Sequence, residues 1–229
     1  MITSKEYTAN LKNYRTADGI KAIILYIIYM AVLFLQGFVY TTNLDANVIN
    51  ILQIIFPLFL LIIGIIFIFL SKEKMTSVGL TGRKLWNSLF SGIALACCFI
   101  AAIIIYFYAV KGELIGFQFP SLNVFIIFII GAVQEEIIFR GYIQTRLTGI
   151  IKNTIICSLL TAFLFIFMHY PTHFIAGGFS LKVLSAFYVI CLLILHFLCD
   201  MVYKRTNCLW GAIMLHFLYN VGQSMIAWQ

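Results

Sequence analysis

Long apolar segments follow one another along this chain, and they limit what it can fold into more than any other feature. A helix needs about 20 mainly apolar residues to cross the hydrocarbon core of a bilayer. Only 10% of the 229 residues are charged, against about a quarter in a soluble domain. The sequence therefore predicts an all-α, polytopic membrane protein with about seven transmembrane helices. These predicted spans are 20–40, 48–70, 86–110, 122–145, 153–170, 181–203 and 207–227.

Basic residues are distributed unevenly over the predicted connections. One side of the membrane receives twelve lysines and arginines, and the other receives only Lys111 and Lys182. Cytoplasmic connections are enriched in Lys and Arg, so we expect the N-terminus in the cytoplasm and the C-terminus outside, in the cell membrane. The net charge of +7 is then a topological signal, and no basic patch indicates a nucleic-acid partner. The twelve residues are Lys5, Lys12, Arg15, Lys21, Lys72, Lys74, Arg83, Lys84, Arg146, Lys152, Lys204 and Arg205.

The chain shows no sign of division into parts. No linker, internal repeat or low-complexity segment separates the apolar runs, which predicts a single integral membrane domain over 1–229. The six cysteines lie in or beside apolar segments, without Cys-x-x-Cys spacing. We therefore expect them to be small packing residues.

Three ionisable residues, Glu135, Glu136 and Arg140, lie within the predicted fourth span. An ionised side chain near the bilayer centre costs roughly 2.5 to 3.5 kcal/mol on insertion scales, so such residues usually serve a function. Glu136 and Arg140 are four residues apart and can pair on one helix face, whereas Glu135 points about 100° away from Glu136. This spacing predicts one carboxylate held by the arginine and another that faces a cavity. The alternative is a structural ion pair with a spare glutamate at the water interface.

Other polar residues occur at spanning depth. His169 ends the fifth span, and His216 and Asn220 share a face of the seventh at i,i+4 spacing; each needs a partner where water is scarce. Counted from the nearest cytoplasmic basic residue at about 1.5 Å per residue, Glu135 and His216 lie about 16 Å deep and His169 about 25 Å. Convergence of these residues therefore requires the fifth helix to tilt or to begin lower.

His196 and Asp200 form a further i,i+4 pair in the sixth span. We interpret it as a local structural pair, and the alternatives are a second site or support for the first one. Several protease classes are disfavoured. The sequence contains no His-Glu-x-x-His, no Gly-x-Ser-x-Gly and no paired aspartates at spanning depth, which argues against zincin, serine and intramembrane aspartyl proteases.

Three short motifs occur in order on separate predicted helices: Glu135-Glu136-x-x-x-Arg140, Phe165-x-x-x-His169 and His216-x-x-x-Asn220. The ordered set resembles the CPBP family of intramembrane proteases, the CAAX-protease and bacteriocin-processing group that includes the type II CAAX prenyl endopeptidases. The resemblance covers roughly 85–226, which would form the family core, preceded by N-terminal helices within 20–70.

The resemblance implies an intramembrane endopeptidase acting on a membrane-associated peptide or protein. Glu135 with His169 would hold and deprotonate the attacking water. His216 and Asn220 would stabilise the oxyanion of the tetrahedral intermediate. The pair of Glu136 and Arg140 would orient these groups. The implied roles are peptide maturation, bacteriocin processing or self-immunity.

The family is also widely described as metalloproteases. Glu135, His169 and His216 could bind a divalent ion such as zinc and leave an open position for water, and the metal-free mechanism names the same residues. Outside the proteases, the alternative is a membrane scaffold, a regulator or a bacteriocin-immunity protein without proteolytic activity. A transporter is disfavoured because the chain has no evident repeated halves.

Overall fold

The computed structural model describes residues 3–112, 118–177 and 185–225, and throughout these ranges the regular structure is helical. This confirms the predicted all-α class. In chain order the elements are α1 (Lys5–Leu11), α2 (Thr16–Tyr40), α3 (Ala46–Leu70), η1 (Met75–Val78), α4 (Leu85–Lys111), α5 (Leu122–Glu135), η2 (Glu136–Gln144), α6 (Thr145–Leu147), α7 (Thr154–Phe167), α8 (Tyr170–Ala176), α9 (Ala186–Thr206) and α10 (Trp210–Met225).

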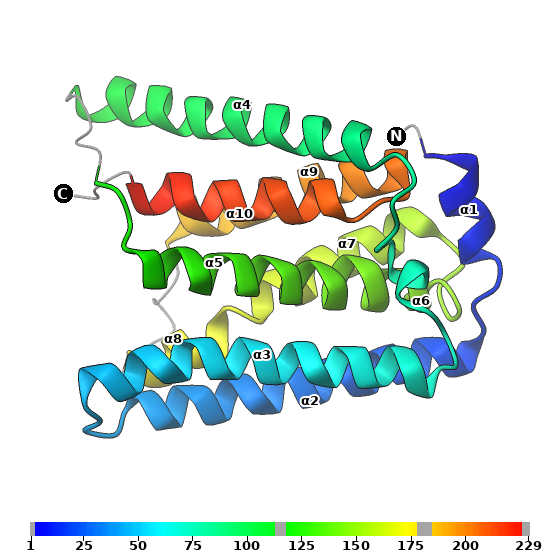
Figure 1. Cartoon of the computed structure of the whole chain (residues 1–229), viewed down its shortest axis with the longest axis horizontal. Helices are drawn as coiled ribbons and strands as arrows, with labels where there is room; N and C mark the ends of the chain where they lie inside the picture. The colour runs from blue at the N-terminus through cyan, green and yellow to red at the C-terminus, as the bar shows by residue number, and fades with distance from the viewer. Residues whose placement is uncertain (1–2, 113–117, 178–184, 226–229) are drawn as a thin grey trace.

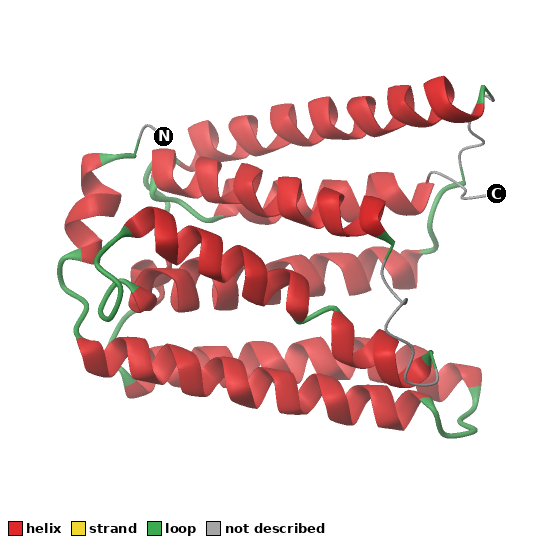
Figure 2. Cartoon of the chain, turned by 180° about the vertical axis from the view of Figure 1, so that it is seen from behind, coloured by secondary structure: helices red, strands yellow, loops and turns green. Residues whose placement is uncertain are grey.

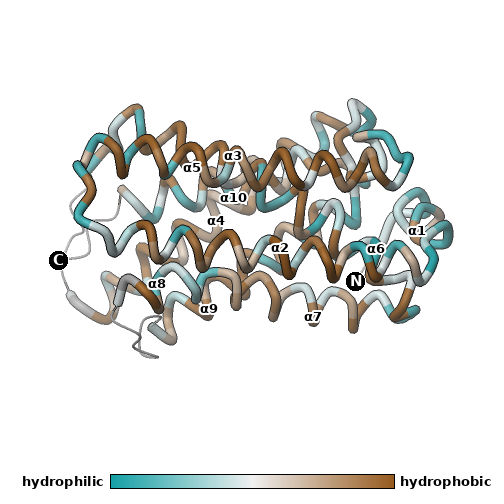
Figure 3. Tube along the Cα trace, turned by 90° about the horizontal axis from the view of Figure 1, so that it is seen from below, coloured by the Kyte–Doolittle hydropathy of each residue, from teal (hydrophilic) through white to brown (hydrophobic). Residues whose placement is uncertain are grey.

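The long helices lie side by side, with α1 at one end of the bundle and the last turn of α10 at the other (Figure 1). In Figure 3 apolar residues run along the bundle, and hydrophilic residues gather at the end that carries α1 and α6. The protein is therefore a multi-pass membrane protein. Within the described residues, six segments are long and apolar enough to cross a membrane: Thr16–Tyr40, Ala46–Leu70, Leu85–Val110, Leu122–Leu147, Thr154–Ile175 and Ala186–Thr206.

The seventh predicted span corresponds to α10, which has 16 described residues and packs mainly against α4. Gly92 and Gly211 allow this close approach, because a Cβ on either glycine would overlap backbone atoms of the facing helix. Together α10 and the six apolar segments match the prediction of about seven spans. Residues 181–184 of the predicted sixth span, which include Lys182, and residues 226–227 of the predicted seventh span lie outside the described residues.

Polar caps set several helix boundaries near the site. The Asn153 side chain accepts hydrogen bonds from the backbone N–H groups of Ile155 and Ile156 and starts α7, as Asn does at helix N-termini. α9 ends at Thr206, and the next residue, Asn207, has a left-handed φ of 54°, a conformation that Asn tolerates at helix ends. The turn that follows directs α10 back along the bundle.

Two features of the backbone differ from the predicted uninterrupted spans. α7 ends at Phe167, and α8 begins at Tyr170 after a short break that is visible in Figure 2. In addition, Glu136–Gln144 form a π-helix within the fourth span, a rare form that is frequent at functional sites. Both irregularities lie beside residues of the motifs.

The cysteines follow the prediction only in part. Cys157, Cys191, Cys199 and Cys208 are buried, which confirms their role in packing, whereas the other two, Cys97 and Cys98, are exposed on α4.

Candidate active site

A cavity of about 520 Å³ lies between α5, α9, α10 and the break that follows α7. Glu135, His169, His216 and Asn220 all line it, so residues separated by up to 85 positions in the sequence meet there. The other lining residues, which the motifs did not identify, are Phe128, Tyr188, Leu192, Tyr219, Gln223 and Ser224.

Glu136 and Arg140 form the predicted ion pair, with Nη1 of the arginine 2.7 Å from Oε1 of the glutamate. Both side chains are fully buried, and neither lines the cavity. The same Oε1 lies 2.8 Å from Nδ1 of His216. When this nitrogen carries the proton it donates to the carboxylate, so the ion pair holds the histidine ring in place.

Glu135 takes the other role that the spacing predicted, because its side chain lines the cavity and is 18% exposed. Its Oε2 lies 3.7 Å from Nε2 of His216. This distance is too long for a direct hydrogen bond and is suited to a bridging water. The same oxygen is buried and has no hydrogen-bond partner among the described residues, so a bound water or a substrate group would satisfy it.

His169 lies between α7 and α8, with Nδ1 2.9 Å from the carbonyl oxygen of Phe165. A proton on Nδ1 satisfies this carbonyl and leaves Nε2 as the acceptor. α7 runs obliquely to its neighbours in Figures 1 and 2. The tilt and the break bring His169 to the cavity despite its greater depth along the chain.

Phe165 is fully buried at the centre of these groups. The centre of its ring lies 4.1 Å from Cζ of Arg140. The ring also packs edge-to-face against both histidine rings, with centroid separations of 5.3 Å to His169 and 5.9 Å to His216. Phe165 is part of the second motif, but nothing in the sequence indicated what its side chain does. The contacts make it a positioning residue for the arginine and both histidines.

Replacing Phe165 with Leu should therefore lower kcat for peptide hydrolysis by about tenfold without changing KM, because a buried cation–π contact contributes up to about 2 kcal/mol. Phe139→Leu is the matched control, since Phe139 is equally buried and packs edge-on against the same ring at 5.4 Å. Steady-state kinetics and melting temperatures of both variants provide the measurement. An equal loss of kcat in the two variants would reduce Phe165 to a packing residue.

The predicted pairing of His196 with Asp200 is wrong. Asp200 accepts hydrogen bonds from Gln144 and Ser158, and it pairs with Nζ of Lys204 at 2.7 Å. Neither ring nitrogen of His196 has a hydrogen-bond partner among the described residues. Helical spacing allowed Asp200 to pair with His196 or with Lys204, which lie four residues before and after it. Asp200 pairs with Lys204.

The described residues do not assemble a metal site. They contain no group of three or more His, Cys, Asp or Glu side chains placed to hold a metal ion. His216 and His169 each engage Nδ1 with the protein, which would leave one nitrogen of each ring and Glu135 as donors. Two histidine nitrogens and a carboxylate are a donor set that catalytic zinc uses, and a metal-ligand role for these three residues stays a prediction.

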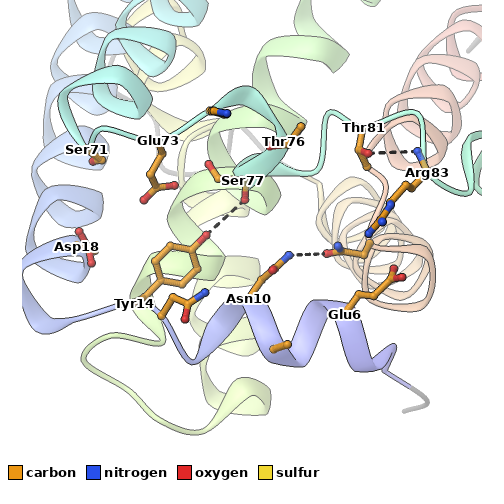
Figure 4. A pocket seen from close by; sticks show the side chains of 14 residues that line it. Glu6, Asn10, Tyr14, Asp18, Ser71, Glu73, Thr76, Ser77, Thr81 and Arg83 are labelled. Atoms are coloured by element: carbon orange, nitrogen blue, oxygen red, sulfur yellow. Dashed lines mark hydrogen bonds between the residues drawn. The ribbon is translucent and has the colours of Figure 1, made fainter.

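A second and larger pocket, of about 900 Å³, lies at the end of the bundle that carries α1 (Figure 4). It contains none of the motif residues. Two of its carboxylates are already paired, Glu73 with Arg146 and Glu6 with Lys84. The pocket is therefore distinct from the candidate site.

Comparison with protein families gives one match that covers this cavity. Residues 117–222 match the family model of Rce1-like type II CAAX prenyl endopeptidases, and this range contains all six predicted site residues. Comparisons with curated proteins and with solved structures find no match. This match over residues 117–222 confirms the resemblance to the CAAX-protease group that the three ordered motifs indicated.

Proposed function

We propose that this protein is an intramembrane endopeptidase that hydrolyses a peptide bond with a water molecule activated by Glu135. The observation that carries the proposal is the cavity, where this glutamate meets His169, His216 and Asn220 at membrane depth. The family match over 117–222 supports the same reaction class. The six catalytic and supporting residues named from the motifs retain the roles that the resemblance implies.

In the first step, Glu135 accepts a proton from the attacking water. Its unpartnered Oε2 is available for this, and a carboxylate in such a setting is a suitable general base. His169, anchored through Nδ1 on the backbone, orients the water through Nε2. The water oxygen then bonds to the carbonyl carbon of the substrate.

In the second step, charge develops on the substrate oxygen, and His216 and Asn220 donate hydrogen bonds to it. A ring protonated on both nitrogens donates through Nδ1 to Glu136 and through Nε2 to the oxyanion. Arg140 balances the charge of Glu136 and keeps it in place. As the C–N bond breaks, the proton held by Glu135 passes to the leaving amine, so atoms and charge balance.

The substrate class that we propose is a peptide or protein associated with the bilayer. A lipid-anchored peptide fits the description of the family. A peptide precursor under maturation, a bacteriocin precursor, or an entering bacteriocin cleaved for self-immunity is consistent with the same site. Phe128 and Leu192 supply apolar walls for such a segment.

We also propose that 1–229 act as one domain, with the helices within 20–70 supporting the family core over 85–226. Gln134 precedes the proposed base, and its Nε2 donates to the hydroxyl of Tyr29 on α2 at 2.9 Å. α3 packs along α5. These contacts favour a supporting role for α2 and α3, which contact α5, the helix that carries Glu135.

The test is cleavage of quenched fluorescent peptides, with and without a lipid anchor, by purified protein in liposomes. We expect cleavage by the wild type, loss of cleavage in Glu135→Ala and His169→Ala, and unchanged membrane levels. Activity that a chelator abolishes and one metal ion restores would replace the mechanism with a metal-dependent one. Full cellular function of both variants would favour a non-proteolytic scaffold, regulator or immunity protein.

A further inference from the structure

The cavity extends from the candidate catalytic residues in one direction only. On α5 the lining residues run from Glu135 back to Phe128, toward the start of the helix. On α10 they run from His216 forward to Gln223 and Ser224, about 10 to 12 Å further along the helix. Both directions lead to the end of the bundle opposite α1 (Figure 1).

α9 gives the same direction independently. Its lining residues, Tyr188 and Leu192, belong to the first two turns of the helix, and α9 begins at the end opposite α1. The lining residues on these three helices therefore all lie at the level of the motif residues or on the side away from α1.

The opposite direction is closed by packed side chains. All nine residues of η2 are buried, and Ile138, Phe139 and Tyr142 are completely so. On α9, the buried pair of Asp200 and Lys204 fills the same level. The pocket of Figure 4 shares no described lining residue with the cavity.

The end with α1 carries the basic residues. The twelve lysines and arginines counted above lie in α1, in the connections next to it or in the adjoining helix turns. Since such connections remain in the cytoplasm, the opposite end faces outward. Beyond Glu135, His169 and His216, the described lining residues carry no Asp, Glu, Lys, Arg or His side chain, so the entrance is polar but uncharged.

We infer that the substrate enters the cavity from the outer face of the membrane, between α5, α9 and α10. This rests on the proposed function for the reaction and on the charge distribution for the side. The substrate class is then an uncharged stretch of an exported or external peptide, or the outer part of a membrane-inserted one. A segment presented at the cytoplasmic face meets the closed side.

Thiol labelling of full-length protein in intact cells tests this, in a background with the exposed Cys97 and Cys98 replaced by Ala. A membrane-impermeant maleimide should modify Ser224→Cys and Thr42→Cys from outside. Asn13→Cys, at the α1 end, should react only after permeabilisation. Thr42 is the matched control because it lies exposed at the outward end but does not line the cavity.

Labelling should also show whether a modified residue blocks the entrance of the cavity or only lies at the outward end of the bundle. Modified Ser224→Cys should lose cleavage of an externally added peptide, and modified Thr42→Cys should keep it. Reaction of Ser224→Cys only from the cytoplasmic side, or only with a lipid-soluble maleimide, would overturn the inference. The labelling pattern does not depend on catalysis, so external labelling in a protein that cleaves no peptide would refute the proposed function and leave the entry route standing.

Discussion

Replacing Glu135 with Gln is expected to lower kcat for peptide hydrolysis by about 10²- to 10⁴-fold, the usual contribution of a general base. The amide has almost the same shape but does not take a proton from water. The fold should tolerate the change, because Oε2 of Glu135 has no hydrogen-bond partner among the described residues. Removing a poorly solvated charge should leave the melting temperature unchanged or raise it.

The measurement is the initial rate of peptide cleavage at saturating substrate, together with thermal unfolding of each purified protein. Glu6→Gln is the matched control: it removes a carboxylate from an exposed pair with Lys84, at the α1 end of the bundle. Its activity should equal that of the wild type. A Glu135→Gln variant with wild-type kcat would show that another group activates the water.

Replacing Arg140 with Met should cost about 3–5 kcal/mol in the free energy of unfolding and abolish activity. The substitution leaves the fully buried Glu136 without its cationic partner, and an unpaired buried charge is strongly destabilising. His216 loses its fixed orientation as well, since Glu136 holds its Nδ1. The double variant Glu136→Gln/Arg140→Met should recover much of the stability but not the activity.

Denaturation of the four proteins of this double-mutant cycle measures the coupling between the two residues. Lys84→Met serves as the control, because the exposed pair of Lys84 and Glu6 should be worth less than about 1 kcal/mol. An Arg140→Met variant as stable as the wild type would mean that Glu136 becomes neutral or finds another partner.

Some parts of the site follow from the sequence because they depend on helix geometry alone. The pairing of Glu136 with Arg140 needs only a spacing of four residues on a continuous helix. The separation of Glu135 from this pair follows from the angle between consecutive residues. The same spacing also permitted His196 to pair with Asp200, and there it misled, because Lys204 lies equally near on the other side of Asp200.

Other parts depend on contacts between helices that are distant along the chain. The bond between His216 and Glu136, the hydrogen-bond partners of Asp200, and the contacts around Phe165 join separate helices. Local periodicity carries no information on which helices are neighbours. Local periodicity did not indicate the π-helix either. The break after α7 has a local cause, because Pro171 lies at the start of α8 and has no N–H to continue the preceding helix.

By itself, the sequence determined the membrane class, the approximate spans, the charge asymmetry and the ordered motifs, because each depends on composition or on local spacing. Only the tertiary structure decided that Glu135, His169, His216 and Asn220 share one cavity, and that this cavity extends away from α1. The physical reason is that depth along one helix does not specify position in the bundle. Helix tilt and side-chain packing set which groups meet and which direction remains open.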